Sequence, residues 1–121
     1  MSFVESLEAL GVNVKEGVDR VMGDQELYET MLDMLVEEVE SYPINLKDFD
    51  NSDYDELTKR VHMLKGTTGN LSITPLFEGY EKALGLLRNK QPGEAKAVFE
   101  KVLPVQAKII DCIKNRGSAA L

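Results

Sequence analysis

Apolar residues recur at intervals of three and four positions along most of this chain, and glycine and proline interrupt the pattern at a few points. An α-helix turns by about 100° per residue, so this spacing gathers apolar side chains on one face. A half-buried strand would instead need strict alternation of apolar and polar residues, and no segment shows it convincingly. The pattern therefore predicts an all-α protein whose helices are joined by short loops.

Two short helices are expected near the N-terminus. The first covers Phe3 to Leu10 and ends at Gly11. The second runs from about Val14 to Met22, with Asn13 as its N-cap and Gly23 after it. An asparagine at that position accepts a hydrogen bond from a free backbone N–H of the first turn.

Longer helices follow in the rest of the chain. We expect them from an Asp24 cap to about Ser41, from a Ser52 or Asp53 cap to about Leu71, from about Pro75 to Leu87, and from about Pro92 to just before Gly117. If Asp53 is the cap, Glu56 completes a capping box. Short connections between such helices favour an antiparallel up-and-down four-helix bundle, so residues 1–121 are predicted to form one domain.

Three local features refine this prediction. The apolar stripe of the helix that begins after Asp24 consists of Leu27, Met31, Leu32, Leu35, Val36 and Val39. The polar segment from Asp48 to Ser52 is interpreted as a turn. Pro104 lies inside the last helix, where its missing N–H and its ring should kink or locally break the helix.

The net charge of −7 limits the classes of partner. A nucleic-acid backbone or an anionic lipid surface would repel such a chain unless it had a concentrated basic face, so we expect protein partners, no nucleic acid and no membrane. The N-terminal residues do not resemble a secretory signal. The single cysteine, Cys112, is interpreted as a small buried hydrophobe. These features favour a cytoplasmic protein, and we expect a monomer because one core needs all the apolar stripes.

The only histidine of the chain lies in the predicted helix that ends near Leu71. Leu57, Val61, Leu64, Thr68 and Leu71 share the core-facing side of this helix. His62 points roughly 130° away from the centre of that side, so we expect its imidazole to be exposed. The outer surface that carries His62 also holds Asp55, Thr58, Lys65, Gly66 and Gly69.

Glycine and lysine near His62 distinguish this surface from an ordinary solvated one. Gly66 and Gly69 each cost roughly 1 kcal/mol relative to alanine inside a helix, and core packing does not explain them on an exposed face. Bare backbone there would let another protein come close to His62. Lys65 lies three residues after His62, within reach of its side chain, and Lys59 and Arg60 are close in sequence.

A neutral imidazole is a competent nucleophile near neutral pH. If His62 takes up a phosphoryl group, a neighbouring ammonium would attract the added negative charge. The chain has no Gly-rich nucleotide-binding loop and no obvious carboxylates for magnesium beside His62, and no metal site is expected. We therefore expect no autonomous kinase activity. Glu78 or Glu81 on the following helix could orient the imidazole.

The run His62-Met63-Leu64-Lys65-Gly66, followed by Gly69-Asn70-Leu71, resembles the signature of histidine phosphotransfer domains. That signature is His-x-Leu-Lys-Gly, then small residues, then a small residue, asparagine and a hydrophobic residue. The resemblance extends over most of the chain, because Gly23-Asp24 before the long acidic helix is similar to the start of the family's first bundle helix. Ser72 departs from the many members that have glycine or another small residue, and Pro104 is unusual.

The resemblance implies that His62 carries a phosphoryl group on a ring nitrogen and exchanges it with an aspartate of a receiver domain. Lys65 corresponds to the family's conserved cation, and Gly66 and Gly69 correspond to the small positions that allow docking; Thr58 shares their surface. The implied partners are a response-regulator receiver domain and a sensor or hybrid histidine kinase. No cofactor is expected on the chain itself, because Mg²⁺ would be bound by the receiver.

Two other interpretations remain open at the level of sequence. The chain could be the phosphoacceptor domain of a chemotaxis-type kinase, phosphorylated by a separate catalytic domain. It could also be a helical binding module in which His62 has no chemical role.

Overall fold

The computed structural model describes residues 2–116, which form helices and no strands. The α-helices are α1 (Phe3–Ala9), α2 (Val14–Arg20), α3 (Gln25–Ser41), α4 (Asp55–Asn70), α5 (Thr74–Arg88) and α6 (Pro92–Lys114), and a 3₁₀ helix, η1 (Leu46–Asp50), lies between α3 and α4. Among these residues, no helix combines the length and the apolar character needed to cross a membrane. The predicted all-α class is confirmed.

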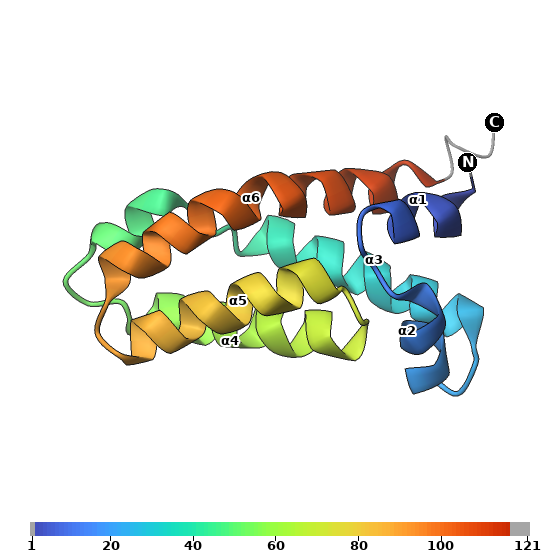
Figure 1. Cartoon of the computed structure of the whole chain (residues 1–121), viewed down its shortest axis with the longest axis horizontal. Helices are drawn as coiled ribbons and strands as arrows, with labels where there is room; N and C mark the ends of the chain where they lie inside the picture. Colours follow the sequence, from blue (N-terminus) through green and yellow to red (C-terminus); the bar gives the residue numbers. More distant parts are fainter. Residues whose placement is uncertain (1, 117–121) are drawn as a thin grey trace.

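Helices α3 to α6 form an antiparallel four-helix bundle (Figure 1). Each of them contacts the next along the chain, and α6 returns to contact α3, which closes the bundle. Helix α5 packs most extensively, against both α4 and α6. The connections from α4 to α5 and from α5 to α6 are short. A connection of a few residues is too short to return along the length of a helix, so consecutive helices run antiparallel.

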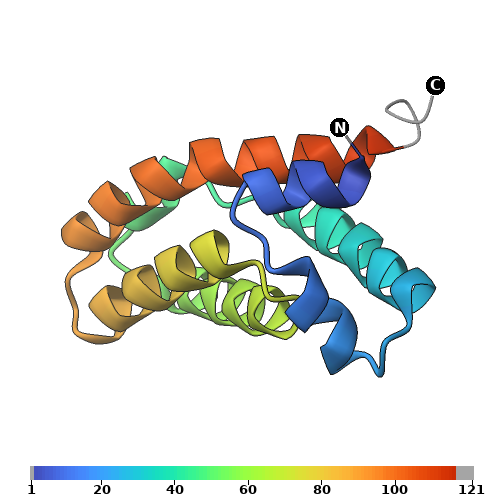
Figure 2. The same ribbon diagram turned by 45° about the vertical axis from the view of Figure 1, so that its right-hand side comes forward.

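The two N-terminal helices cover the end of the bundle that holds the start of α3 and the end of α6. Helix α1 packs against the last part of α6, as both views show (Figures 1 and 2). Helix α2 packs against α3. Buried apolar side chains from all these helices form one continuous core, as the amphipathic stripes require. Its largest fully buried members include Tyr28, Tyr80 and Phe99.

The N-caps that the sequence predicts for α2 and α3 are present. The side-chain oxygens of Asn13 and Asp24 accept hydrogen bonds from the backbone N–H groups of Glu16 and Leu27, at 3.1 and 3.0 Å. The capping box predicted for α4 is wrong. Tyr54 is the N-cap residue there, and Asp53 instead accepts a local hydrogen bond from the Asp55 N–H at 3.1 Å. This aspartate therefore stabilises the turn before the helix rather than its first turn.

Two core assignments also need correction. In α3, Leu27 is 44% exposed whereas its neighbour Tyr28 is fully buried, so the buried face is rotated from the predicted stripe. The segment interpreted as a polar turn overlaps η1, whose Phe49 is buried against Phe99 with ring centroids 5.2 Å apart. Phe49 thus belongs to the core, because burial of an aromatic ring is strongly favourable and the polar neighbours Asp48 and Asp50 keep contact with water.

Pro104 does not break the last helix, because α6 continues without interruption from Pro92 to Lys114. Pro104 is exposed, and so is Glu100, whose carbonyl would otherwise have accepted the missing hydrogen bond. Water can hydrate that carbonyl on the outer face of the helix, which reduces the cost of the proline. The partly exposed thiol of Cys112 is packed against the core rather than inside it, and partial burial raises its pKa.

Candidate functional site

His62 lies on the solvent side of α4, as the helical phase predicts. Leu57, Val61 and Leu64 point into the core from the opposite side of the same helix. The packing of these residues fixes the rotation of α4, and that rotation leaves the imidazole exposed. His62 is therefore accessible to another molecule.

Gly66 and Gly69 have different surroundings, although both follow His62 on α4. A methyl group added at Gly66 would have no atom within 4 Å, apart from its own helix. One added at Gly69 would lie 2.9 Å from Cδ1 of Phe77 on α5. The expectation that packing explains neither glycine is thus wrong for Gly69, where the α5 aromatic ring needs the space. Of these two glycines, only Gly66 presents bare backbone to solvent without a packing reason.

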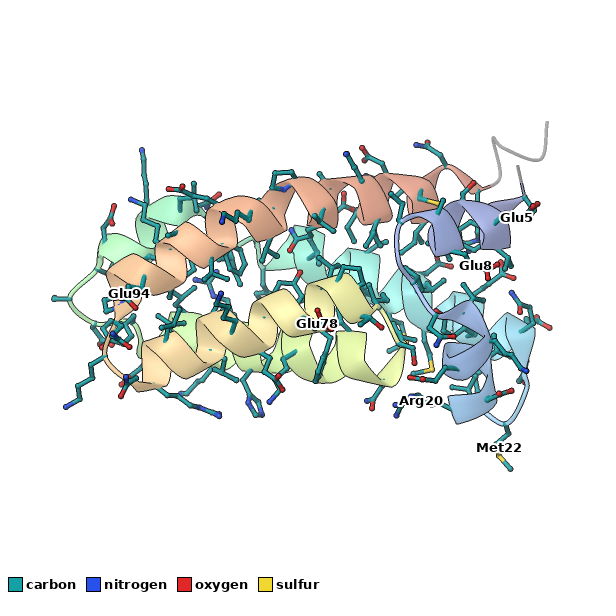
Figure 3. The ribbon with its side chains drawn as sticks, viewed as in Figure 1. Glu5, Glu8, Arg20, Met22, Glu78 and Glu94 are labelled. Carbon is teal, nitrogen blue, oxygen red and sulfur yellow. The ribbon has the colours of Figure 1, made fainter. Side chains whose placement is uncertain are left out.

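Lys65 extends toward α5, where its Nζ lies 3.8 Å from Oε2 of Glu81. Both side chains are partly exposed, so this ion pair contributes little to stability and can be exchanged for another partner. Glu81 is therefore occupied with Lys65 rather than with the imidazole, and Glu78 is exposed on α5 (Figure 3). Neither glutamate orients His62, contrary to the alternative considered from the sequence.

Arg88, in the last turn of α5, contacts the imidazole instead. Its Nη2 lies 3.1 Å from Nδ1 of His62. A guanidinium is always protonated and can only donate, so Nδ1 must accept with its lone pair. A neutral ring then carries its proton on Nε2. The residue that holds the imidazole is thus a cation, which sequence reasoning missed.

A signal for Arg88 does exist in the sequence. Arg88 follows Glu81 by seven residues, two helical turns, so both lie on the same face of α5. Because α4 and α5 are antiparallel, the later residue on α5 lies nearer the start of α4, on the side of Thr58 rather than of Lys65. Arg88 and Thr58 indeed line the same surface depression. Predicting this contact required knowing which face of α5 is turned to α4.

Arg60 does not join the cations around His62. Its guanidinium donates to the carbonyl of Pro43 at 2.8 Å and lies 3.4 Å from Oδ2 of Asp48. Both partners belong to the connection between α3 and α4. The basic residue that directly precedes Val61 therefore stabilises the fold.

An open groove of about 540 Å³ begins at His62 and leads toward α2. Its lining includes Lys65, Gly66, Phe77 and Arg20. Thr58 lies on the other side of His62, where its hydroxyl donates to the Tyr54 carbonyl at 2.8 Å. The predicted site residues therefore share one surface, with Lys65, Gly66 and Gly69 on the groove side of His62 and Thr58 on the Arg88 side.

The far end of the groove is held by polar contacts between α2 and the end of α4. Figure 3 shows Arg20 on α2. Its Nε donates to Oγ of Ser72 at 3.2 Å. Ser72 in turn donates to Glu16 at 2.8 Å. The hydrogen bonds from Ser72 and then Arg20 lower the pKa of the Glu16 carboxyl. These contacts fix the position of α2 beside the groove.

Among residues 2–116, no three His, Cys, Asp or Glu side chains are gathered closely enough to hold a metal ion. Comparison of the chain with protein-family models, curated proteins and solved structures finds no match. The resemblance to histidine phosphotransfer domains therefore remains a prediction from the sequence motif.

Proposed function

We propose that this protein carries a phosphoryl group on His62 and exchanges it with an aspartate of a receiver domain in two-component signalling. The observation that carries the proposal is an exposed imidazole beside bare backbone and a loosely held ammonium. Within residues 2–116, Nε2 of His62 has no hydrogen-bond partner, whereas Nδ1 is covered by Arg88. Nε2 is therefore the nitrogen that an incoming phosphoryl group would meet.

The transfer requires a ring whose Nε2 has a free lone pair, so the resting ring must first release its Nε2 proton to water and take one up on Nδ1, which breaks the contact with Arg88. That lone pair attacks the phosphorus of an aspartyl phosphate, the phosphorus–oxygen bond breaks, and the carboxylate leaves with the electron pair. The group passes through a loose transition state stabilised mainly by positioning and charge. Mg²⁺ bound by the receiver would neutralise part of the negative charge of the transition state. The receiver would therefore activate the phosphoryl group, and this chain provides the accepting nitrogen.

We assign to Lys65 the role of stabilising the phosphorylated form of His62. Its ammonium is 3.8 Å from the single carboxylate of Glu81 and is partly exposed. A phosphoryl group on His62 carries up to about two negative charges, so it competes well with one carboxylate for the same ammonium. Lys65 then stabilises the phosphohistidine without needing the fixed geometry of a guanidinium.

The surroundings of His62 suit a docking protein. Met63 is 43% exposed beside the histidine, and Phe77 lines the groove beyond Gly66. An apolar rim of this kind supplies binding energy, while the bare backbone at Gly66 lets a loop approach the imidazole. A modest interface would let the partner dissociate after transfer. Thr58, Gly66 and Gly69 are the docking positions in this proposal.

The direct test is to incubate the protein with a phosphorylated receiver domain and Mg²⁺. We expect acid-labile, base-stable phosphate to appear on the chain, and we expect none on a His62→Gln variant with an unchanged circular dichroism spectrum. Label that persists in this variant, or no label with any of several receivers, would contradict the proposal.

Replacing the receivers with the catalytic domain of a chemotaxis-type kinase tests that alternative in the same assay. A partner that binds both forms equally, without label, would favour the binding module.

A further inference from the structure

Arg88 differs from the other arginines of the chain in its partner. Arg20, Arg60 and Arg116 each lie within 4 Å of a carboxylate, at 3.3, 3.4 and 2.6 Å respectively. Arg88 forms no such pair in the part of the chain that the structure describes, and its side-chain hydrogen bond is to Nδ1 of His62. In an acidic protein, with a net charge of −7, this arginine is thus paired with the proposed phosphoacceptor instead of with an acid.

The chemistry of phosphohistidine gives this contact a consequence. Hydrolysis occurs when a water oxygen attacks the phosphorus and the nitrogen–phosphorus bond pair returns to Nε2. If Nδ1 is protonated, the leaving group is a neutral imidazole and the bond breaks readily. If Nδ1 has no proton, the leaving group would be an imidazolide anion, which is far poorer. The proton on Nδ1 therefore controls how long the phosphorylated form lasts.

We propose that Arg88 protects phosphorylated His62 from hydrolysis by occupying the lone pair of Nδ1 and so excluding a proton from it. This inference rests on the proposed function and adds a positioning residue to it. The guanidinium can only donate, so its contact with Nδ1 is lost whenever that nitrogen is protonated. After the attack by Nε2, the ring releases its Nδ1 proton to water and Arg88 donates to the freed lone pair.

The geometry also separates the two cations by role. Lys65 lies on the groove side of His62, where the phosphoryl group would be delivered. Arg88 lies on the other side, beside Thr58. Lys65 acts on the phosphoryl oxygens, whereas Arg88 acts through the imidazole. Removing Arg88 should therefore shorten the lifetime of the phosphorylated form and change its pH dependence without slowing its formation, because the contact with Nδ1 favours the tautomer that cannot attack.

The test compares the full chain with Arg88→Met, Arg88→Lys and Lys90→Gln. Met has a long side chain without a donor, Lys keeps a donor that is charged at neutral pH, and Lys90 is an exposed cation beside the same depression. Each protein is phosphorylated with phosphoramidate, the donor is removed, and loss of phosphate is followed by ³¹P NMR from about pH 5 to about pH 9. Nitrogen NMR of the unphosphorylated proteins reports which ring nitrogen carries the proton.

We expect Arg88→Met to lose phosphate about tenfold faster near neutral pH, because the loss of one charge-assisted hydrogen bond corresponds to about a tenfold change. Its acid-catalysed loss should begin at a higher pH. Arg88→Lys should recover part of the lifetime, and Lys90→Gln should match the parent. Equal lifetimes and pH profiles in the parent and Arg88→Met would overturn the inference while leaving the proposed function intact, as would a parent ring protonated on Nδ1. No phosphate on His62 in any variant would overturn both.

Discussion

At the scale of single residues, Gly66 and Gly69 show how one residue type serves two purposes on one helix. Gly69 is required by the Phe77 ring, since an added Cβ would lie 2.9 Å from Cδ1. Gly66 has open space where its side chain would be, so it weakens α4 without improving the packing. A helix gains roughly 1 kcal/mol when alanine replaces an interior glycine without a clash.

We therefore expect Gly66→Ala to raise the free energy of unfolding by about 0.5–1 kcal/mol. Gly69→Ala should raise it less or lower it, because the Phe77 ring must move to accept the methyl group. Urea denaturation of the two variants measures the difference, and each serves as the other's control for helix propensity. A Gly69→Ala variant that is as stabilised as Gly66→Ala would show that the ring yields at no cost.

The sequence was sufficient to predict the exposure of His62 but not its contacts. Exposure follows from the phase of one helix, which the apolar stripe of α4 defines by itself. The Arg88 contact depends on the rotation of α5 and on its position along α4, which no single stripe defines. The Glu78 and Glu81 alternative failed for this reason, since a rotation of a few tens of degrees decides which side chain reaches the imidazole.

At the scale of helices, three C-termini share a strained ending. Helices α2, α4 and α5 are each followed by a residue with positive φ that is not glycine, namely Met22 (60°), Ser72 (56°) and Lys90 (59°). At each end, this residue's N–H and the next one bond back to carbonyls of the last turn, which is the Schellman pattern. The pattern normally places glycine at this position, because other residues there cost roughly 1–2 kcal/mol.

We expect Met22→Gly and Lys90→Gly each to raise the free energy of unfolding by about 0.5–1 kcal/mol. Met22 is 97% exposed and projects away from the molecule, so its loss removes no packing (Figure 3). Ser72→Gly should gain less, because it deletes the hydroxyl that bonds both Glu16 and Arg20. Thermal and urea unfolding of the three variants check this order. Equal gains at all three positions would mean that the Ser72 hydroxyl contributes nothing to stability.

Helix boundaries were largely predictable because caps and breakers act locally. Asn13, Asp24, Pro75 and Pro92 each lie where the sequence indicates a start. The failures have tertiary causes. Asp53 turns to a nearer donor, Phe49 is drawn into the core by Phe99, and Pro104 is tolerated because it faces water.

At the scale of the whole molecule, Tyr28 joins three helices at the end of the bundle. It is fully buried on α3 and donates from its hydroxyl to the Leu71 carbonyl at the end of α4, at 2.8 Å. Gly17 of α2 lies against its ring, where an added Cβ would clash with Cε1. Burial raises the pKa of Tyr28 to about 12 from its ordinary value of 10.0, and it also raises the pKa of the buried Tyr80.

These shifts make the fold sensitive to alkali. Below the unfolded-state pKa of 10.0, both states hold the Tyr28 proton and stability does not depend on it. Between this value and about 12, the unfolded state releases the proton while the folded state keeps it, so stability falls by about 1.4 kcal/mol per pH unit.

We expect Tyr28→Phe to be less stable than the parent by about 1 kcal/mol near pH 8, because the Leu71 carbonyl loses its donor. That deficit should shrink or reverse near pH 11. At this pH the parent has lost stability because its unfolded state releases the Tyr28 proton, and the Phe variant has no such proton to lose. Urea unfolding at the two pH values measures both differences, with Tyr42→Phe as the control because Tyr42 is 62% exposed. A deficit in Tyr28→Phe that is the same at both pH values would show that this hydroxyl is not held protonated by the junction of α2, α3 and α4.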